Sequence, residues 1–286
     1  MAKEKIPEQH EAITRAKKQL DQLEMFVDIC ANALDKSTQV VQMIEVTQRL
    51  AKQANLSEKI MTEEELVRIK EQAGKVEAFA RQQKEDGFTY LFSLAIVRLW
   101  SILEALVDDL VVDFISRPEE CKDKNLIYDL KGPLLEFATA SPEQQADFLA
   151  ERLKDAVNAG LKPGIGRFES MLEPIGLGGG IDQDVRRVLF ELSQVRNAIV
   201  HKGGITDKRF VAACPWLNFK VSKPLKINSQ NFFLYCVAVY WYALELRLRI
   251  VGFLGKEKPQ EYIDLLRESG DVIRELWANR IEKGNA

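Results

Sequence analysis

Residue types that bind metals are scarce in this sequence, which has two histidines and four cysteines among 286 residues. The cysteines, Cys30, Cys121, Cys214 and Cys236, lie far apart and include no CxxC pair. A structural zinc site needs closely spaced ligand pairs, so we expect neither a bound metal nor another cofactor. The same wide spacing disfavours a disulfide framework and favours a reducing, cytoplasmic setting.

Long apolar runs are also missing. No stretch reaches the roughly 18 uninterrupted apolar residues that a membrane span requires. The charged start, MAKEKIPEQH, includes no apolar segment typical of a signal peptide. The longest apolar run, residues 91–115, is interrupted by Arg98, Glu104 and two aspartates, and we interpret it as a buried helix. The sequence therefore predicts no membrane association.

Charge of one sign does not dominate the whole chain, whose net charge is -3, but its distribution is uneven. Residues 181–226 contain nine Lys or Arg and four Asp or Glu, a net charge of +5, so the remainder carries -8. A basic segment in an acidic protein suggests a local anionic ligand. A solvated basic surface explains the charge equally well.

Helical periodicity runs through most of the chain, and the fold class predicted is all-α. Residues 1–86 are rich in Glu, Lys and Gln and predict a helical hairpin or coiled-coil-like arm, in which Thr62 and Glu65 form a capping box. Residues 87–286 predict a helical domain. Within it, one helix begins after Asp182 and ends at Gly203, and residues 219–221 and 225–227 are candidates for short extended pieces.

The end of that helix carries the residues with the clearest chemistry. In Arg196-Asn197-Ala198-Ile199-Val200-His201, Asn197 and His201 are four residues apart and share a helix face. Arg196 is adjacent and reaches the same rim. One turn thus offers a permanent cation, an amide and an imidazole, the side-chain type that ordinarily titrates nearest neutral pH. The structural alternative is that these residues complement the helix dipole at its C-terminus.

This set of groups suits RNA cleavage without a metal. The ribose 2′-OH attacks the adjacent phosphorus, an imidazole can take its proton, and a guanidinium can bind phosphate oxygens and stabilise the developing negative charge. The spacing alone does not decide between this function and the structural alternative.

The segment 191–204, ELSQVRNAIVHKGG, resembles the signature helix of the HEPN superfamily, whose motif is Arg, a polar residue, three or more residues, then His. The resemblance covers roughly residues 86–254 and is nearest to the branch found in bacterial defence and stress loci. It implies a bundle of four or more helices and a homodimer with a composite site. It also implies a ribonuclease, often a toxin or antiviral effector, with Arg196, Asn197 and His201 as catalytic residues. Some members have lost the motif and only bind.

Further residues are candidates for supporting roles. Glu104, one helical turn after Trp100, and Asp108, one turn further, are candidates to orient Arg196 or His201, although carboxylates on a helix edge reaching solvent fit equally well. The cations proposed to bind RNA phosphates are Lys202, Arg187 and Lys208. The run Tyr240-Trp241-Tyr242 is expected in the core rather than in base stacking, and the other histidine, His10, is expected on the solvated surface.

Three functions remain open from the sequence. The first is a metal-independent endoribonuclease acting on RNA as a homodimer. The second is a non-catalytic dimerisation, nucleic-acid-binding or protein-binding module. The third combines them, with residues 1–85 binding a regulatory partner that controls the site.

Overall fold

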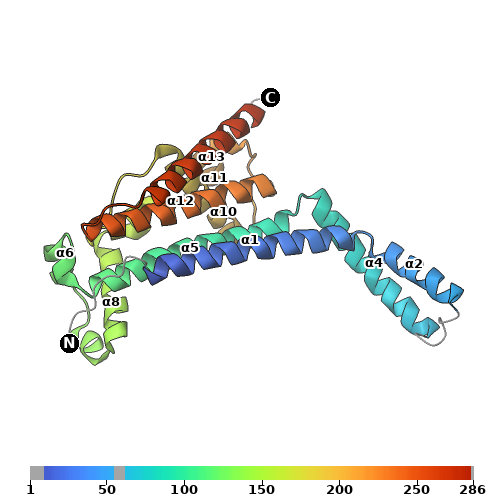
Figure 1. The fold of residues 1–286 in the computed structure, drawn as a ribbon, viewed down its shortest axis with the longest axis horizontal. Helices are drawn as coiled ribbons and strands as arrows, with labels where there is room; N and C mark the ends of the chain where they lie inside the picture. Colours follow the sequence, from blue (N-terminus) through green and yellow to red (C-terminus); the bar gives the residue numbers. More distant parts are fainter. Residues whose placement is uncertain (1–9, 55–61, 285–286) are drawn as a thin grey trace. The chain divides into compact units, whose positions relative to one another are not determined.

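The computed structural model describes residues 10–54 and 62–284, and the regular secondary structure in these ranges is helical, with no β-strand (Figure 1). The all-α prediction is therefore confirmed, while the narrower prediction of a HEPN-like bundle stays a prediction. Three short 3-10 helices occur at Pro118–Glu120 (η1), Ala159–Leu161 (η2) and Pro215–Leu217 (η3). The α-helices are α1 (Glu11–Ser37), α2 (Val40–Gln53), α4 (Glu63–Glu85), α5 (Thr89–Ile115), α6 (Lys124–Tyr128), α7 (Leu134–Thr139), α8 (Pro142–Ala156), α9 (Gly166–Leu172), α10 (Gln183–Lys202), α11 (Lys208–Ala213), α12 (Ser229–Phe253) and α13 (Gln260–Gly284).

The chain divides into two compact units. The larger contains residues up to 23, 96–225 and 230 onwards, and the smaller contains residues 24–95 with 226–229. The sequence placed the boundary after residue 86. The observed division differs because α1 and α5 each run through both units, so no break in helical pattern marks it.

The larger unit is organised around α12, which is buried on most sides, including the side chains of Tyr235 and Tyr242. Helix α13 lies against it, with the Arg247 guanidinium carbon 3.9 Å from the ring centroid of Tyr262. Trp100 of α5 contacts Phe168 of α9 at a ring-centroid distance of 5.4 Å. Burial of these large apolar side chains is the main favourable contribution to folding of this unit.

Helix α5 is the one helix in the described part of the chain that is long and apolar enough to cross a membrane by length and composition. However, 56% of its most apolar stretch is buried inside the protein. A core helix passes the same test of length and composition.

The start of α1 packs along α5 in the antiparallel direction. His10 lies 3.0 Å from Asp113 through its Nε2 atom, and Arg15 forms an ion pair with Asp109 one turn earlier on α5. The prediction that His10 is a solvated residue is wrong, because the residue is only 7% exposed and its ring stacks near that of Phe114. The polar residues around His10 in the sequence suggested exposure to solvent, and they gave no sign of its contact with Asp113, 103 positions away.

Asp113→Asn is expected to lower the free energy of unfolding by about 1.5–3 kcal/mol at neutral pH, because a carboxylate with charge-assisted hydrogen bonds is lost. Burial alone would raise the pKa of Asp113, but the hydrogen bond with His10 and the charge of Arg117 together lower it below 3.8. A lowered carboxyl pKa stabilises the fold above the unfolded value, and this stabilisation is lost as pH falls through the folded value.

Urea unfolding at neutral and acidic pH measures this difference. The wild type and Asp113→Asn should converge as the pH falls below 3.8. Asp109→Asn is the matched control on the same helix, since its partner Arg15 is exposed and such pairs contribute about 0–1 kcal/mol. Equal losses for the two variants would contradict the assignment.

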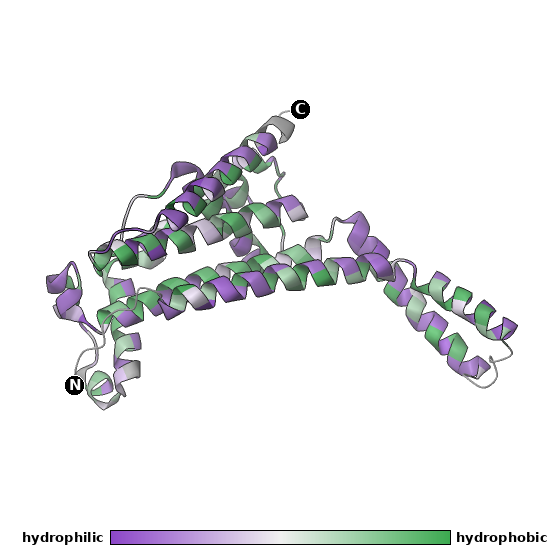
Figure 2. Ribbon diagram, in the orientation of Figure 1, coloured by the Kyte–Doolittle hydropathy of each residue, from purple (hydrophilic) through white to green (hydrophobic). Residues whose placement is uncertain are grey.

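In the smaller unit, α2 and α4 form a helical hairpin. The backbone N–H of Val41 donates to the Glu77 carboxylate at 3.0 Å. The predicted capping box is confirmed: Thr62 accepts from the N–H of Glu65, whose carboxylate accepts from the N–H of Thr62. Figure 2 shows apolar and polar residues alternating along both helices, and none of the α2 residues is fully buried.

Candidate functional site

Helix α10 begins and ends where the sequence predicted. The Asp182 carboxylate accepts hydrogen bonds from the N–H groups of Asp184 and Val185, at 2.9 and 3.4 Å, which satisfies free donors at the helix start. Gly203 has φ +59°, a left-handed conformation that glycine adopts without strain. The N–H of Gly204 then donates to the Ala198 carbonyl and closes the helix end.

One face of α10 is buried in the larger unit and the opposite face is open at its last turns. Val188, Leu192 and Val195 are buried, whereas Asn197 and His201 are exposed. Arg196 lies at the edge between these faces and donates to the Asn197 side-chain oxygen at 3.2 Å. The buried stripe therefore fixes the helix and leaves Asn197 and His201 on its open face, with the half-buried Arg196 at the edge of that face.

Glu104 of α5 faces Arg196, as the sequence analysis considered. Its Oε2 atom lies 3.9 Å from Nη2 of Arg196, while Oε1 accepts a hydrogen bond from Nη1 of Arg167 on α9 at 3.1 Å. One carboxylate thus holds two guanidinium groups, the nearer being Arg167. The longer Arg196 pair leaves donors of that guanidinium free for an anion.

Asp108 lies close enough to Glu104 and Arg167 to feel their charges. Desolvation by the surrounding protein raises the pKa of its carboxyl, with repulsion from Glu104 adding to the shift and attraction from Lys154 and Arg167 opposing it. No hydrogen bond joins Asp108 to the three motif residues within the described chain. Its role beside the site therefore stays a prediction.

His201 and Asn197 line a small pocket of about 190 Å³ at the end of α10. The pocket contains two side-chain amides, one imidazole and two cations, Lys202 and Arg209, with Asp207 as its single acid. Its full lining is Gln194, Asn197, Ala198, His201, Lys202, Asp207, Arg209 and Phe210. Arg196 does not line this pocket: it lies five residues before His201, about 140° round the helix axis, and its link to the pocket is the hydrogen bond that it donates to Asn197.

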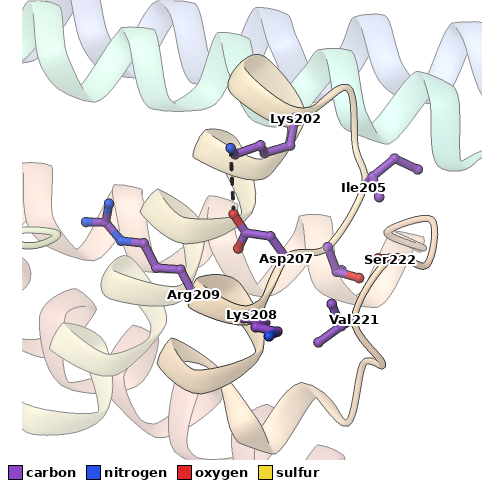
Figure 3. Close-up of a pocket in the computed structure, with 8 residues that line it drawn as sticks. Lys202, Ile205, Asp207, Lys208, Arg209, Val221 and Ser222 are labelled. Carbon is purple, nitrogen blue, oxygen red and sulfur yellow. Dashed lines mark ion pairs between the residues drawn. The ribbon is translucent and has the colours of Figure 1, made fainter.

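A larger pocket of about 590 Å³ adjoins the first and is drawn in Figure 3. Lys208, one of the predicted RNA-binding residues, lines it, and Lys202 forms an ion pair with Asp207 at 3.9 Å. Arg187 lies elsewhere: it donates to Asp184 near the start of α10 and its guanidinium is 5.5 Å from the Trp277 ring centroid. The structure therefore brings together Lys202 and Lys208 but leaves Arg187 near the other end of the helix.

Two polar networks involve residues that the sequence analysis did not select. Glu191 of α10 is 0% exposed, accepts hydrogen bonds from the Trp216 indole N–H and the Tyr235 hydroxyl, and lies 2.7 Å from Arg280 of α13. Burial first, and then repulsion from Glu191, raises the pKa of Tyr235 well above its ordinary value. This network fixes α10 to α12 and α13.

The second network holds the glycine-rich loop 176–180. Arg249 of α12 donates to both carboxylate oxygens of Glu169 at 2.9 Å and to the carbonyl oxygens of Leu177 and Gly180. Tyr242 donates to the same Glu169 carboxylate. These hydrogen bonds engage polar groups of the loop and hold it against α12. The buried Trp241 and Tyr242 lie in the core, as expected.

Metal-binding groups do not converge in the ranges 10–54 and 62–284, where no three His, Cys, Asp or Glu side chains are placed to hold an ion. The four cysteines are free, and three of them are buried. Burial and then the Glu191 charge raise the pKa of the Cys214 thiol to about 12, so this thiol is protonated at neutral pH.

Comparison with known proteins gave no assignment: no family model, no curated protein and no solved structure matches this chain.

Proposed function

We propose that this protein is an endoribonuclease of the HEPN type that cleaves RNA by 2′-OH attack and needs no metal ion. The observation that carries the proposal is the open end of α10, where Asn197 and His201 line a pocket and Arg196 donates a hydrogen bond to Asn197 while it faces Glu104. A cytoplasmic setting, without membrane association, and a role as a toxin or antiviral effector belong to the same proposal.

In the proposed reaction, His201 accepts the proton of the ribose 2′-OH as that oxygen attacks phosphorus. The bond from phosphorus to the 5′-oxygen breaks, which leaves a 2′,3′-cyclic phosphate and a 5′-hydroxyl. Arg196 stabilises the negative charge on the phosphorane oxygens, and Asn197 hydrogen-bonds the phosphate or the ribose. Glu104 is a positioning residue, since it contacts Arg196 rather than the reacting atoms.

The leaving 5′-oxygen must receive a proton. In a homodimer with a composite site, the second copy of His201 would supply it after the first has accepted one. A single α10 offers one imidazole, so this division of roles requires two chains. Cleavage of cellular RNA by the wild type in EDTA, with loss of cleavage in Arg196→Ala and His201→Ala, tests the proposed function.

A second candidate function is self-association through the smaller unit. On α2, Met43, Val46 and Leu50 recur at helical spacing and are 61%, 47% and 60% exposed, so an apolar stripe faces solvent. Glu45 and Arg49 flank it on one side. In an antiparallel pair of α2 helices, each Glu45 would face an Arg49 of the other copy, which favours a second copy of this chain as the occupant. A regulatory partner binding residues 1–85 is the alternative.

Leu50→Asp is expected to convert such a dimer to monomer, because a charge would be placed in the apolar contact. Light scattering after size-exclusion chromatography measures the mass. Glu45→Arg should weaken the dimer and Glu45→Arg with Arg49→Glu should restore it, since the double change restores opposite charges. A mass unaffected by Leu50→Asp would place any dimer contact elsewhere, including at α10.

A further inference from the structure

The two pockets at the end of α10 lie next to each other. Lys202, Asp207 and Arg209 line both the pocket that contains His201 and the larger one. The larger pocket extends over Ile205 and Val221, which lie on the side away from Lys202 and Arg209 in Figure 3. A ligand reaching from His201 along this surface would meet cations first and apolar side chains next.

The loop that shapes the larger pocket is held in place by its own backbone. The Thr206 hydroxyl, buried in the loop, donates to the carbonyl oxygens of Lys220 and Lys223, and the N–H of Ser222 donates to the Thr206 carbonyl. The N–H of Leu225 donates to the Gly204 carbonyl at 2.7 Å. Residues 219–221 and 225–227, considered above as short extended pieces, form no β-strand, and this loop has one isolated β-bridge, Ile205 to Pro224. The pocket is thus largely pre-formed.

The net positive charge of the larger pocket favours an anionic ligand. Lys202, Lys208 and Arg209 face one acid, Asp207, whose charge is partly offset by Lys202 at 3.9 Å. Lys208 and Arg209 form no ion pair within the described residues and are exposed. Both cations are therefore available to phosphate oxygens.

The apolar side of the larger pocket favours a ligand that has an apolar part as well as an anionic group. Ile205 and Val221 are exposed apolar side chains that line this open, shallow pocket. A nucleotide has a phosphate for Lys208 and Arg209 and an apolar base face for Ile205 and Val221. Entry of a base requires that it be unstacked, which occurs in single-stranded RNA and not in a duplex.

We propose that this pocket is a subsite for the nucleotide next to the scissile phosphate, so that the substrate is single-stranded RNA, bound by Lys208 and Arg209 through phosphate and by Ile205 and Val221 through the base. The assignment rests on the proposed ribonuclease function. It adds Arg209, which lines both pockets, as the cation that connects the subsite to the cleavage site.

The test is binding of a fluorescent, single-stranded 2′-O-methyl RNA of mixed sequence, which cannot be cleaved, to the full chain over a range of salt concentrations. Lys208→Ala and Arg209→Ala should each weaken binding several-fold and reduce the slope of log K against log salt by about 0.7, the value for one phosphate contact on a single strand. Ile205→Ser with Val221→Ser should weaken binding without changing that slope. Lys162→Ala, an exposed lysine of the same unit, is the matched control.

Binding by Lys208→Ala and Arg209→Ala equal to that of Lys162→Ala would overturn the subsite, as would equally tight binding of the same sequence as a duplex. Failure of the wild type to bind the RNA would also overturn it. If the binding pattern holds but no RNA is cleaved, the ribonuclease proposal fails and the subsite stands. If cleavage depends on His201 while the pocket variants bind normally, the subsite fails alone.

Discussion

His201→Ala is expected to lower metal-independent RNA cleavage by roughly 10²–10⁴-fold, the usual contribution of a general acid or base. The side chain is exposed at the end of α10 and makes no hydrogen bond within the described residues. Its removal should therefore change the free energy of unfolding by no more than about 0.5 kcal/mol. Loss of activity without loss of stability is the combination that a dipole-capping role for His201 does not produce.

Arg196→Ala is expected to lose about 10²–10³-fold, by analogy with removal of one group that stabilises transition-state charge. Both variants are compared with wild type on total cellular RNA in EDTA, after size-exclusion chromatography and thermal unfolding have shown that all fold and associate alike. Val200→Ala, an exposed apolar residue on the same helix turn, is the matched control and should cleave as wild type.

Equal cleavage by wild type, Arg196→Ala and His201→Ala would show that the RNase activity is a contaminant or resides elsewhere. An activity that EDTA removes would overturn the metal-independent mechanism. Wild type that binds single-stranded RNA without cleaving it would favour the non-catalytic binding module. Each outcome selects between the functions that the sequence left open.

Local sequence patterns predicted the helices and their ends, which depend on residues close together in the sequence. Apolar periodicity gave the long helices, and capping residues such as Asp182 and Gly203 fixed the ends of α10, because helix ends are satisfied by residues within a few positions. The juxtaposition of Asn197 and His201 also follows from helix geometry alone. These features required no knowledge of which helices pack together.

Contacts between distant helices had no such local signal. Arg167 reaches Glu104 across 63 positions, and Arg209 lines the same pocket as His201 because the chain turns back after Gly203. Glu191 did have a signal: it follows Val188 by three residues and precedes Leu192, so an acid sits on the apolar stripe of α10. Such an acid must be paired when buried, and its partners are on other helices.

Glu191→Gln is expected to destabilise the larger unit by about 3–5 kcal/mol, the cost of removing one member of a buried ion pair. The side chain is fully buried, and its charge faces Arg280 at 2.7 Å while its oxygens accept from Trp216 and Tyr235. Glutamine keeps nearly the same shape but leaves the Arg280 guanidinium without its countercharge and turns one acceptor into a donor facing donors. The loss should appear as a lower urea midpoint with an unchanged slope.

Glu275→Gln on α13 is the matched control, since this exposed glutamate should change the free energy of unfolding by no more than about 0.5 kcal/mol. Arg280→Met added to Glu191→Gln should recover part of the stability, because the unpaired charge is removed with its partner. A loss below about 1 kcal/mol, or no recovery, would contradict the pairing.

Glu191 lies on the helix that carries Arg196 and His201, but it is buried and takes no part in the proposed reaction. Glu191→Gln should therefore reduce cleavage only in proportion to the unfolded fraction, and cooling that restores folding should restore activity. His201→Ala offers the contrast, since its activity stays low under conditions in which the chain is fully folded.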